Sequence, residues 1–182
     1  MKVNVNELRN LIPTLKAGDK IELSGTIYTG RDAAHKKFTE LIEKGEKLPF
    51  EIKDSVIYYA GPTGTKPGMV IGSCGPTTSG RMDKYAPELL DMGMAAMIGK
   101  GERNQSVVDA IVRNKAVYFC AIGGAGALAC KSIKSCEVIA FEELGCESVK
   151  RLEIEDFPLI VTVDCNGNDL FAQGRKKYCK IQ

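Results

Sequence analysis

The feature that most constrains the fold is an alternation of apolar runs and amphipathic segments, which begins near residue 68 and continues through most of the chain. MAAMIG precedes a helical pattern in VVDAIVRN, and AVYFC precedes the small-residue segment ALACKSI and the apolar run CEVIAF. Alternating strands and helices are typical of layered α/β domains with parallel strands. The pattern therefore predicts an α/β fold, with a mixed sheet and helices packed on it.

The first segments predict a helix over residues 7–16, a strand in KIELSGTIYTG with Gly25 as a bulge, and a helix in RDAAHKKFTELIEKG that ends at Gly45. SVIYYAG and GMVIGSCG indicate two further strands, which we expect to pair as a hairpin, and PLIVTVDCNGN indicates a last strand. These early strands suggest an antiparallel portion added to the parallel sheet.

Length and charge limit the class of protein. A chain of 182 residues without a linker or repeat predicts a single domain over residues 1–182. Lys and Arg number 25 against 23 Asp and Glu, and no long run of one sign indicates a nucleic-acid or membrane partner. The chain has no signal-peptide pattern and no stretch near the roughly 18 apolar residues of a membrane span, so we expect a cytoplasmic protein.

The cysteines indicate a reducing compartment rather than a disulfide framework, because their number is odd and no CxxC pair occurs. Cys130, Cys136 and Cys146 are too widely spaced for a compact iron–sulfur ligand run, so we expect structural thiols and no metal ligand in this chain. The seven are Cys74, Cys120, Cys130, Cys136, Cys146, Cys165 and Cys179.

The loop GSCGPTTSGRMD joins a predicted strand to a predicted helix. Its hydroxyl residues Thr77, Thr78 and Ser79 are good helix caps, and Gly75 and Gly80 permit close backbone approach. A helix start also binds anions, and the guanidinium of Arg81 suits a carboxylate or phosphate. The loop is therefore consistent with both a cap and an anion site.

Two more cations follow predicted strands, Arg31 and Lys100, and such positions lie where open α/β sheets bind ligands. Three cations at one rim would suit a small dicarboxylate, although three solvated charges explain them equally well. His35 lies one helical turn after Arg31 and could support it as an acid or base, but an exposed histidine is the simpler interpretation.

GGAGALA offers a rival hypothesis, because Gly124, Gly126 and Ala129 match a dinucleotide fingerprint and Glu142 or Glu143 follows the next strand. The helix after this fingerprint would be unusually short. Too few residues then remain for a second mononucleotide-binding half. Dinucleotide binding is therefore a remote alternative.

Together GTIYTGRDAAHK, YAGPTG, GSCGPTTSGRMD, IGKGER and VDCNGNDL resemble the β subunit of class I fumarate hydratase, in order from about residue 18 to residue 175. The β subunit of L-tartrate dehydratase is similar. The resemblance implies a swivelling β/β/α fold and a hydro-lyase that interconverts (S)-malate and fumarate. It also implies a [4Fe-4S] cluster carried by a partner α subunit, in a hetero-oligomer for which α2β2 is one arrangement.

Carried over by motif, Arg31, Arg81 and Lys100 would bind the substrate carboxylates together with Thr78 and Gly80, and Thr77 would be the candidate base. The neighbours that would support them are Asp32, His35 and Asp83.

Gly30, Ala34 and the pair Ser79–Gly80 look more like the fumarate version than the tartrate version, although tartrate stays open. A third possibility is that the chain is a non-catalytic subunit that closes over its partner.

Overall fold

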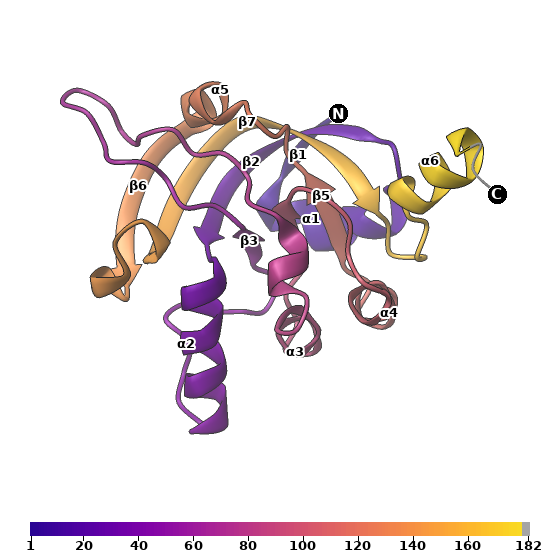
Figure 1. Ribbon diagram of the computed structural model, residues 1–182, viewed down its shortest axis with the longest axis horizontal. Coiled ribbons are helices and arrows are strands. Elements are labelled where there is room, and N and C mark those ends of the chain that lie inside the picture. The colour runs from indigo at the N-terminus through magenta and orange to yellow at the C-terminus, as the bar shows by residue number, and fades with distance from the viewer. Residues whose placement is uncertain (180–182) are drawn as a thin grey trace.

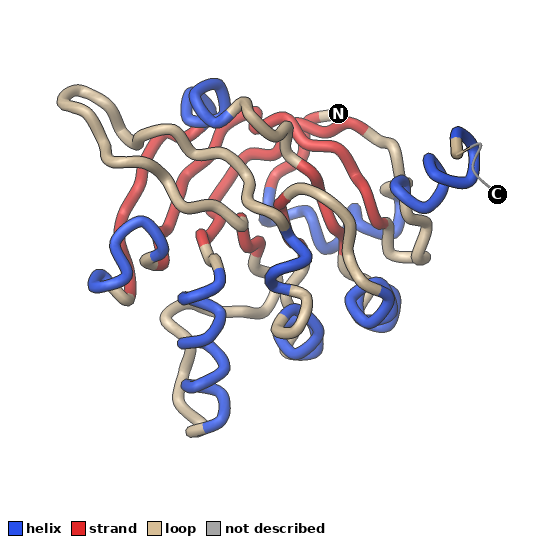
Figure 2. Tube along the Cα trace, in the orientation of Figure 1, coloured by secondary structure: helices blue, strands red, loops and turns tan. Residues whose placement is uncertain are grey.

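In residues 1–179, which the computed structural model describes, seven strands form one mixed sheet with helices packed on it (Figures 1 and 2). The strands are β1 (Lys2–Asn4), β2 (Lys20–Thr29), β3 (Val56–Tyr58), β4 (Ala96–Gly99), β5 (Val117–Cys120), β6 (Ile133–Ala140) and β7 (Val149–Val163). The α-helices are α1 (Val5–Leu11), α2 (Asp32–Glu43), α3 (Ala86–Asp91), α4 (Gln105–Arg113), α5 (Gly126–Ala129) and α6 (Leu170–Tyr178). Short 3₁₀ turns are η1 (Ile12–Thr14), η2 (Ser79–Met82), η3 (Cys130–Ser132) and η4 (Glu142–Glu147).

The strand order is β1-β2-β3-β4-β5-β7-β6. Neighbours from β1 to β5 run parallel, whereas β7 runs antiparallel to β2, β5 and β6. The pairing of β2 with β7, from Lys20 opposite Ile160 to Tyr28 opposite Arg151, closes β2, β3, β4, β5 and β7 into a ring. The register of this pair shifts between Leu23 and Gly25, where Gly25 has φ of +122°, so the predicted bulge is confirmed.

Alternating side chains of the central strands separate two hydrophobic clusters. Val56 and Tyr58 of β3 face the inside of the ring, while Ile57 faces α2, α3 and α4. Figure 1 shows these three helices on one side of the sheet and α5 on the opposite side. Because both faces of β3, β4 and β5 are buried, these strands are continuous apolar runs, which made them easy to predict. The predicted fold class, a swivelling β/β/α domain with a mixed sheet, is confirmed.

The predicted hairpin is wrong. Only SVIYYAG contains a strand, and residues 61–78 form a long loop that extends from the sheet (Figure 2). Met69 and Val70 are 46% and 51% exposed, and the loop is joined across its base by the Thr63 amide, which donates to the Ser73 carbonyl. Ile71 and Cys74 of the same run are buried in the core inside the ring, so the burial of part of an apolar run does not by itself make it a strand.

The antiparallel portion comes from β6 and β7, not from a hairpin of the early strands. β7 begins at Val149, well before the predicted PLIVTVDCNGN, because charged residues on its exposed positions obscure the alternation of its buried ones. Within residues 1–179, no helix combines the length and the apolar character that crossing a bilayer requires.

Candidate active site

The structure brings the predicted cations to one edge of the sheet. Arg31 follows β2 and Lys100 follows β4, and the loop of Thr77 and Arg81 lies beside them. The Thr77 amide donates to the Tyr59 carbonyl at 2.7 Å, just past the end of β3, and Thr78 pairs with Lys100 in a parallel bridge. Because β2, β3 and β4 are parallel neighbours, their carboxyl ends form one rim.

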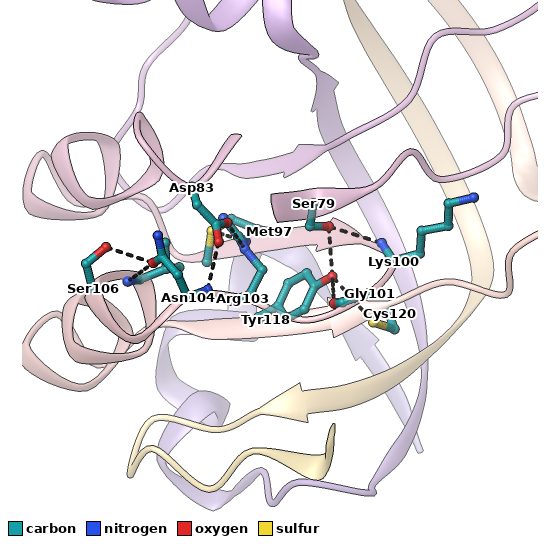
Figure 3. A network of polar contacts seen from close by, with 11 residues as sticks. Ser79, Asp83, Met97, Lys100, Gly101, Arg103, Asn104, Ser106, Tyr118 and Cys120 are labelled. Carbon is teal, nitrogen blue, oxygen red and sulfur yellow. Dashed lines mark hydrogen bonds and ion pairs between the residues drawn. The ribbon is translucent and has the colours of Figure 1, made fainter. Parts of the chain in front are cut away.

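Ser79 fixes the loop against the residues after β4. Its amide donates to the Lys100 carbonyl at 2.9 Å, and its Oγ accepts from the Lys100 amide at 3.1 Å. The Tyr118 hydroxyl lies 2.8 Å from Ser79 Oγ and 2.9 Å from the Gly101 carbonyl oxygen (Figure 3). In the same view the Lys100 side chain extends away from this network, and its ammonium has no ion pair within residues 1–179. Sequence reasoning missed Tyr118, because it lies inside an apolar strand.

Arg81 is held by Asp32. Its Nε lies 2.9 Å from Asp32 Oδ1, and the Arg81 side chain is 51% exposed. Asp32, at the start of α2, therefore contacts one of the predicted carboxylate-binding residues. Asp32 engages only Nε of the Arg81 guanidinium.

Arg31 lies against a residue that no motif predicted, Glu147 at the end of η4. Arg31 Nη2 is 3.2 Å from Glu147 Oε1, and the two side chains are 21% and 22% exposed. Arg31 Nε is buried and has no hydrogen-bond partner among the described residues. Nothing in the sequence indicated Glu147, because η4 is far from α2 along the chain and only the folded structure brings them together.

Asp83 binds a second residue that the sequence did not reveal, Arg103. The Arg103 side chain is fully buried, its Nε donates to Asp83 Oδ1 at 2.6 Å, and the Asn104 amide donates to Asp83 Oδ2 at 2.7 Å (Figure 3). The guanidinium carbon lies 5.3 Å and 5.0 Å from the ring centres of Tyr59 and Tyr118. Asp83 thus ties the loop to the segment of Arg103 and Asn104, and these side-chain contacts do not involve the exposed cations.

His35 is not an exposed histidine, so that expectation is wrong. Its ring is buried among aromatic rings, with Phe38 and Tyr59 at 5.5 Å and 5.4 Å between ring centres. Burial lowers the pKa of His35 from 6.5 to about 4, so the imidazole is neutral near pH 7. Its Nδ1 lies 2.9 Å from the Arg31 carbonyl oxygen, which places it under the start of α2 as a support for the backbone of Arg31.

The glycines of GGAGALA serve close packing of two loops. α5 has only four residues, so the helix that a dinucleotide fingerprint requires is missing from this segment. A Cβ added at Gly126 would lie 2.5 Å from Ser73 Oγ and 2.9 Å from the Gly75 amide nitrogen. The Cys74 amide also donates to the Gly126 carbonyl at 3.1 Å.

Cys74 and Cys165 are buried, and Cys146 is exposed. Burial raises the pKa of the Cys74 thiol to about 12, which keeps it protonated and inert. Among the described residues, no group of three or more His, Cys, Asp or Glu side chains is arranged to hold a metal ion. The side chains of residues 1–179 therefore do not fit an iron–sulfur cluster.

A hollow of about 280 Å³ between α5 and β7, lined by Ile122, Leu128 and Phe157 among others, contains none of the predicted site residues. The candidate site is instead an open rim of cations and hydroxyl groups. Its cations lie at the carboxyl ends of parallel strands, the place where open α/β sheets bind ligands, and their charge is suited to small anions.

Comparison with known proteins identifies the family. Residues 1–174 match the model of the fumarase C-terminus family, and the chain belongs to this family. It is 44% identical to "Fumarate hydratase class I, anaerobic" of Escherichia coli (strain K12), over 98% of this chain and 34% of that protein. It is 47% identical to "Fumarate hydratase class I, aerobic" of the same strain, over 88% of this chain and 30% of that protein.

The chain spans about a third of the length of these fumarate hydratases. A relative of its own size is "Putative L(+)-tartrate dehydratase subunit beta" of Methanocaldococcus jannaschii, which is 39% identical over 97% of this chain and 94% of that protein.

Proposed function

We propose that this chain is the β subunit of a [4Fe-4S]-dependent hydro-lyase that interconverts fumarate and (S)-malate. The observation that carries the proposal is the convergence of Arg31, Arg81, Lys100 and Thr77 at the carboxyl ends of three neighbouring parallel strands. The identity with class I fumarate hydratases supports the choice of reaction. A cytoplasmic location is part of the proposal.

The cations would bind the two carboxylates of the substrate. Arg81 offers both terminal nitrogens to one carboxylate in a bidentate pair, since its Nε is engaged by Asp32. Lys100 offers an ammonium without an ion pair within residues 1–179, and Arg31 offers the positive charge of its guanidinium, with 21% of its side chain exposed. Thr78 and Gly80 are both exposed at the same loop and would complete the binding surface.

Thr77 would remove the C3 proton of malate. Loss of this proton builds negative charge on the substrate, and the nearby cations would stabilise that charge in the transition state. A hydroxyl is a weak base, so Thr77 needs a neighbour that takes up its proton. Thr77 is half-buried, and the positive charges of the neighbouring cations would stabilise its deprotonated hydroxyl.

The partner would be an α subunit. Because the side chains of residues 1–179 do not fit an iron–sulfur cluster, we assign the cluster and its cysteine ligands to that subunit. The name of the similar M. jannaschii protein, a subunit beta, supports assembly with a second chain. A hetero-oligomer such as α2β2 follows, with the active site shared between the subunits.

The second candidate is L-tartrate dehydratase, which would convert tartrate to oxaloacetate. The match over 94% of the putative tartrate dehydratase subunit favours it. Both reactions remove water from a dicarboxylate, so the same cations would serve either substrate.

The decisive experiment co-produces the chain with its α partner without oxygen and assays (S)-malate, fumarate and L-tartrate. Preferential turnover of malate and fumarate supports the proposal, whereas preference for tartrate selects the second candidate. The isolated chain should turn over none of them. Activity of the isolated chain would contradict a shared site, and full activity of the α subunit alone would make this chain a non-catalytic subunit.

A further inference from the structure

We infer that Glu147 is a positioning residue that fixes the guanidinium of Arg31 for a substrate carboxylate. The inference rests on the proposed function, because it assigns the residue that prepares one of the proposed carboxylate-binding groups.

Glu147 makes one contact with each of its carboxylate oxygens. Oε1 lies 3.2 Å from Arg31 Nη2, and Oε2 accepts a hydrogen bond from the Ala33 amide at 3.0 Å. Arg31 is the N-cap residue of α2 and provides no side-chain cap, so Glu147 caps the helix from a distant segment. One carboxylate thus binds both the backbone and the side chain at the start of α2.

The other side of Arg31 is closed by Gly61, two residues after Tyr59, whose carbonyl accepts from the Thr77 amide. A Cβ added at Gly61 would lie 2.5 Å from Arg31 Nη1 and 3.0 Å from Arg31 Cδ. The guanidinium is therefore held between the backbone at Gly61 and the carboxylate of Glu147. Its buried Nε lacks a hydrogen-bond partner in the described part of the chain, and a buried donor without an acceptor favours a ligand that supplies one.

A buried lysine holds the segment that carries Glu147. Lys150 Nζ lies 2.6 Å from Ser148 Oγ, 3.1 Å from the Gly145 carbonyl and 3.3 Å from the Cys146 carbonyl. The Lys150 side chain has no carboxylate partner within residues 1–179, so its hydrogen bonds go to this turn.

Thr29 joins the same turn to the end of β2. Its hydroxyl donates to the Ser148 carbonyl at 3.2 Å and accepts from the Lys150 amide at 3.0 Å. Since Thr29 is two residues before Arg31, the turn and the arginine are fixed to the same strand end.

Removal of the Glu147 carboxylate could either weaken or tighten substrate binding, and the direction of the change tests the inference. A carboxylate near a dicarboxylate substrate repels it, so if Glu147 only competed for Arg31, its removal would tighten substrate binding. If Glu147 positions Arg31, its removal weakens binding, because the arginine must then be ordered by the substrate itself.

The test is Glu147→Gln in the assembled complex, with Glu143→Gln as the matched control. Gln keeps the size of Glu147, but its amide nitrogen would face either the Ala33 amide or Arg31 unfavourably. Glu143 is on the same 3₁₀ turn, its Oε1 lies 4.0 Å from Lys37 Nζ on α2, and its side chain is 64% exposed. We expect KM for malate to rise about tenfold in E147Q with kcat changed less, and no change in E143Q. An unchanged or lower KM in E147Q would overturn the inference.

A second readout separates this inference from the proposed function. In the isolated full chain, the Nε–H of Arg31 should exchange slowly with solvent in NMR spectra, faster in E147Q, and as in wild type in E143Q. If the wild-type complex turned over neither malate nor tartrate, the proposed function would fail while this exchange would still decide the role of Glu147. Equal exchange in wild type and E147Q would refute positioning whatever the kinetics, and Glu147→Asp should restore part of the protection.

Discussion

Arg81 and Asp32 link the loop after β3 to the first turn of α2, through a 2.9 Å contact between Nε and Oδ1. Asp32 Oδ2 is buried and has no hydrogen-bond partner in the described residues, so the carboxylate is directed at Arg81 by one oxygen only. The pair is partly exposed and contributes little to stability. The pair instead orients Arg81, because a guanidinium that is bound at Nε keeps both of its terminal nitrogens for another ligand.

Arg81→Lys should therefore impair binding although it keeps the charge. A lysine ammonium cannot pair with Asp32 and also present two parallel donors to a carboxylate. We expect KM for malate to rise at least tenfold in the assembled complex, measured by steady-state kinetics. Arg113→Lys is the control, since Arg113 makes a two-bond pair with Asp91 on the surface between α3 and α4. Unchanged KM and kcat in R81K would remove Arg81 from the site.

Thr77→Ala should leave the complex assembled and lower kcat by about 10²-fold or more, the usual range for loss of a general base. The Thr77 backbone is fixed by its amide bond to the Tyr59 carbonyl, which alanine keeps. Size-exclusion chromatography with the α subunit checks assembly, and a malate assay checks turnover. Near-normal turnover would show that the hydroxyl of Thr77 is not the base, and Thr78→Ala would then be the next variant to assay.

The sequence was informative where the physical cause is local. β3, β4 and β5 were predicted because both of their faces are buried, and Arg31 and Lys100 were predicted at strand ends because they follow strands within two residues. The run GMVIGSCG was misread as a strand, since periodicity cannot report whether an apolar run pairs with a neighbouring strand.

The rest of the site depends on contacts between distant segments. Glu147 contacts Arg31 from 116 positions further along the chain. Arg103 is a buried charged residue, which composition and periodicity do not predict. His35 was wrongly predicted to be exposed, because histidine fits either face of an amphipathic helix. Its burial follows from Tyr59 and Phe38, whose rings surround it.

Gly99→Ala should destabilise the chain, because a Cβ at this position would lie 1.9 Å from Ser79 Oγ and 3.0 Å from Tyr59 Cδ2. Inserting a methyl group into such a packed site costs about 1–3 kcal/mol of unfolding free energy. Gly174→Ala is the control, since a Cβ there has no atom within 4 Å and lies within α6. Urea unfolding should show a large loss for G99A and no loss for G174A. Equal stability of G99A and wild type would mean that Ser79 can move without cost.

His35 should make the stability of the folded chain depend on pH in a defined window. Its pKa is about 4 in the folded chain, where burial disfavours the imidazolium, and near 6.5 when unfolded. Between these values the unfolded chain binds a proton that the folded chain does not, so the free energy of unfolding falls as pH drops from 6.5 to 4. His35 alone should account for a loss of about 2–3 kcal/mol between pH 7.5 and pH 4.5.

Comparison with His35→Gln isolates this contribution, because glutamine stays neutral while carboxylates and other groups titrate alike in both proteins. Urea unfolding at pH 7.5, 5.5 and 4.5 gives the difference in unfolding free energy between wild type and H35Q at each pH. At pH 7.5 wild type should be the more stable protein, since its Nδ1 contact with the Arg31 carbonyl and its packing on Phe38 are intact. That advantage should shrink or reverse toward pH 4.5. A difference that stays constant with pH would show that the folded chain accommodates a charged imidazole, and that His35 is not held neutral under the start of α2.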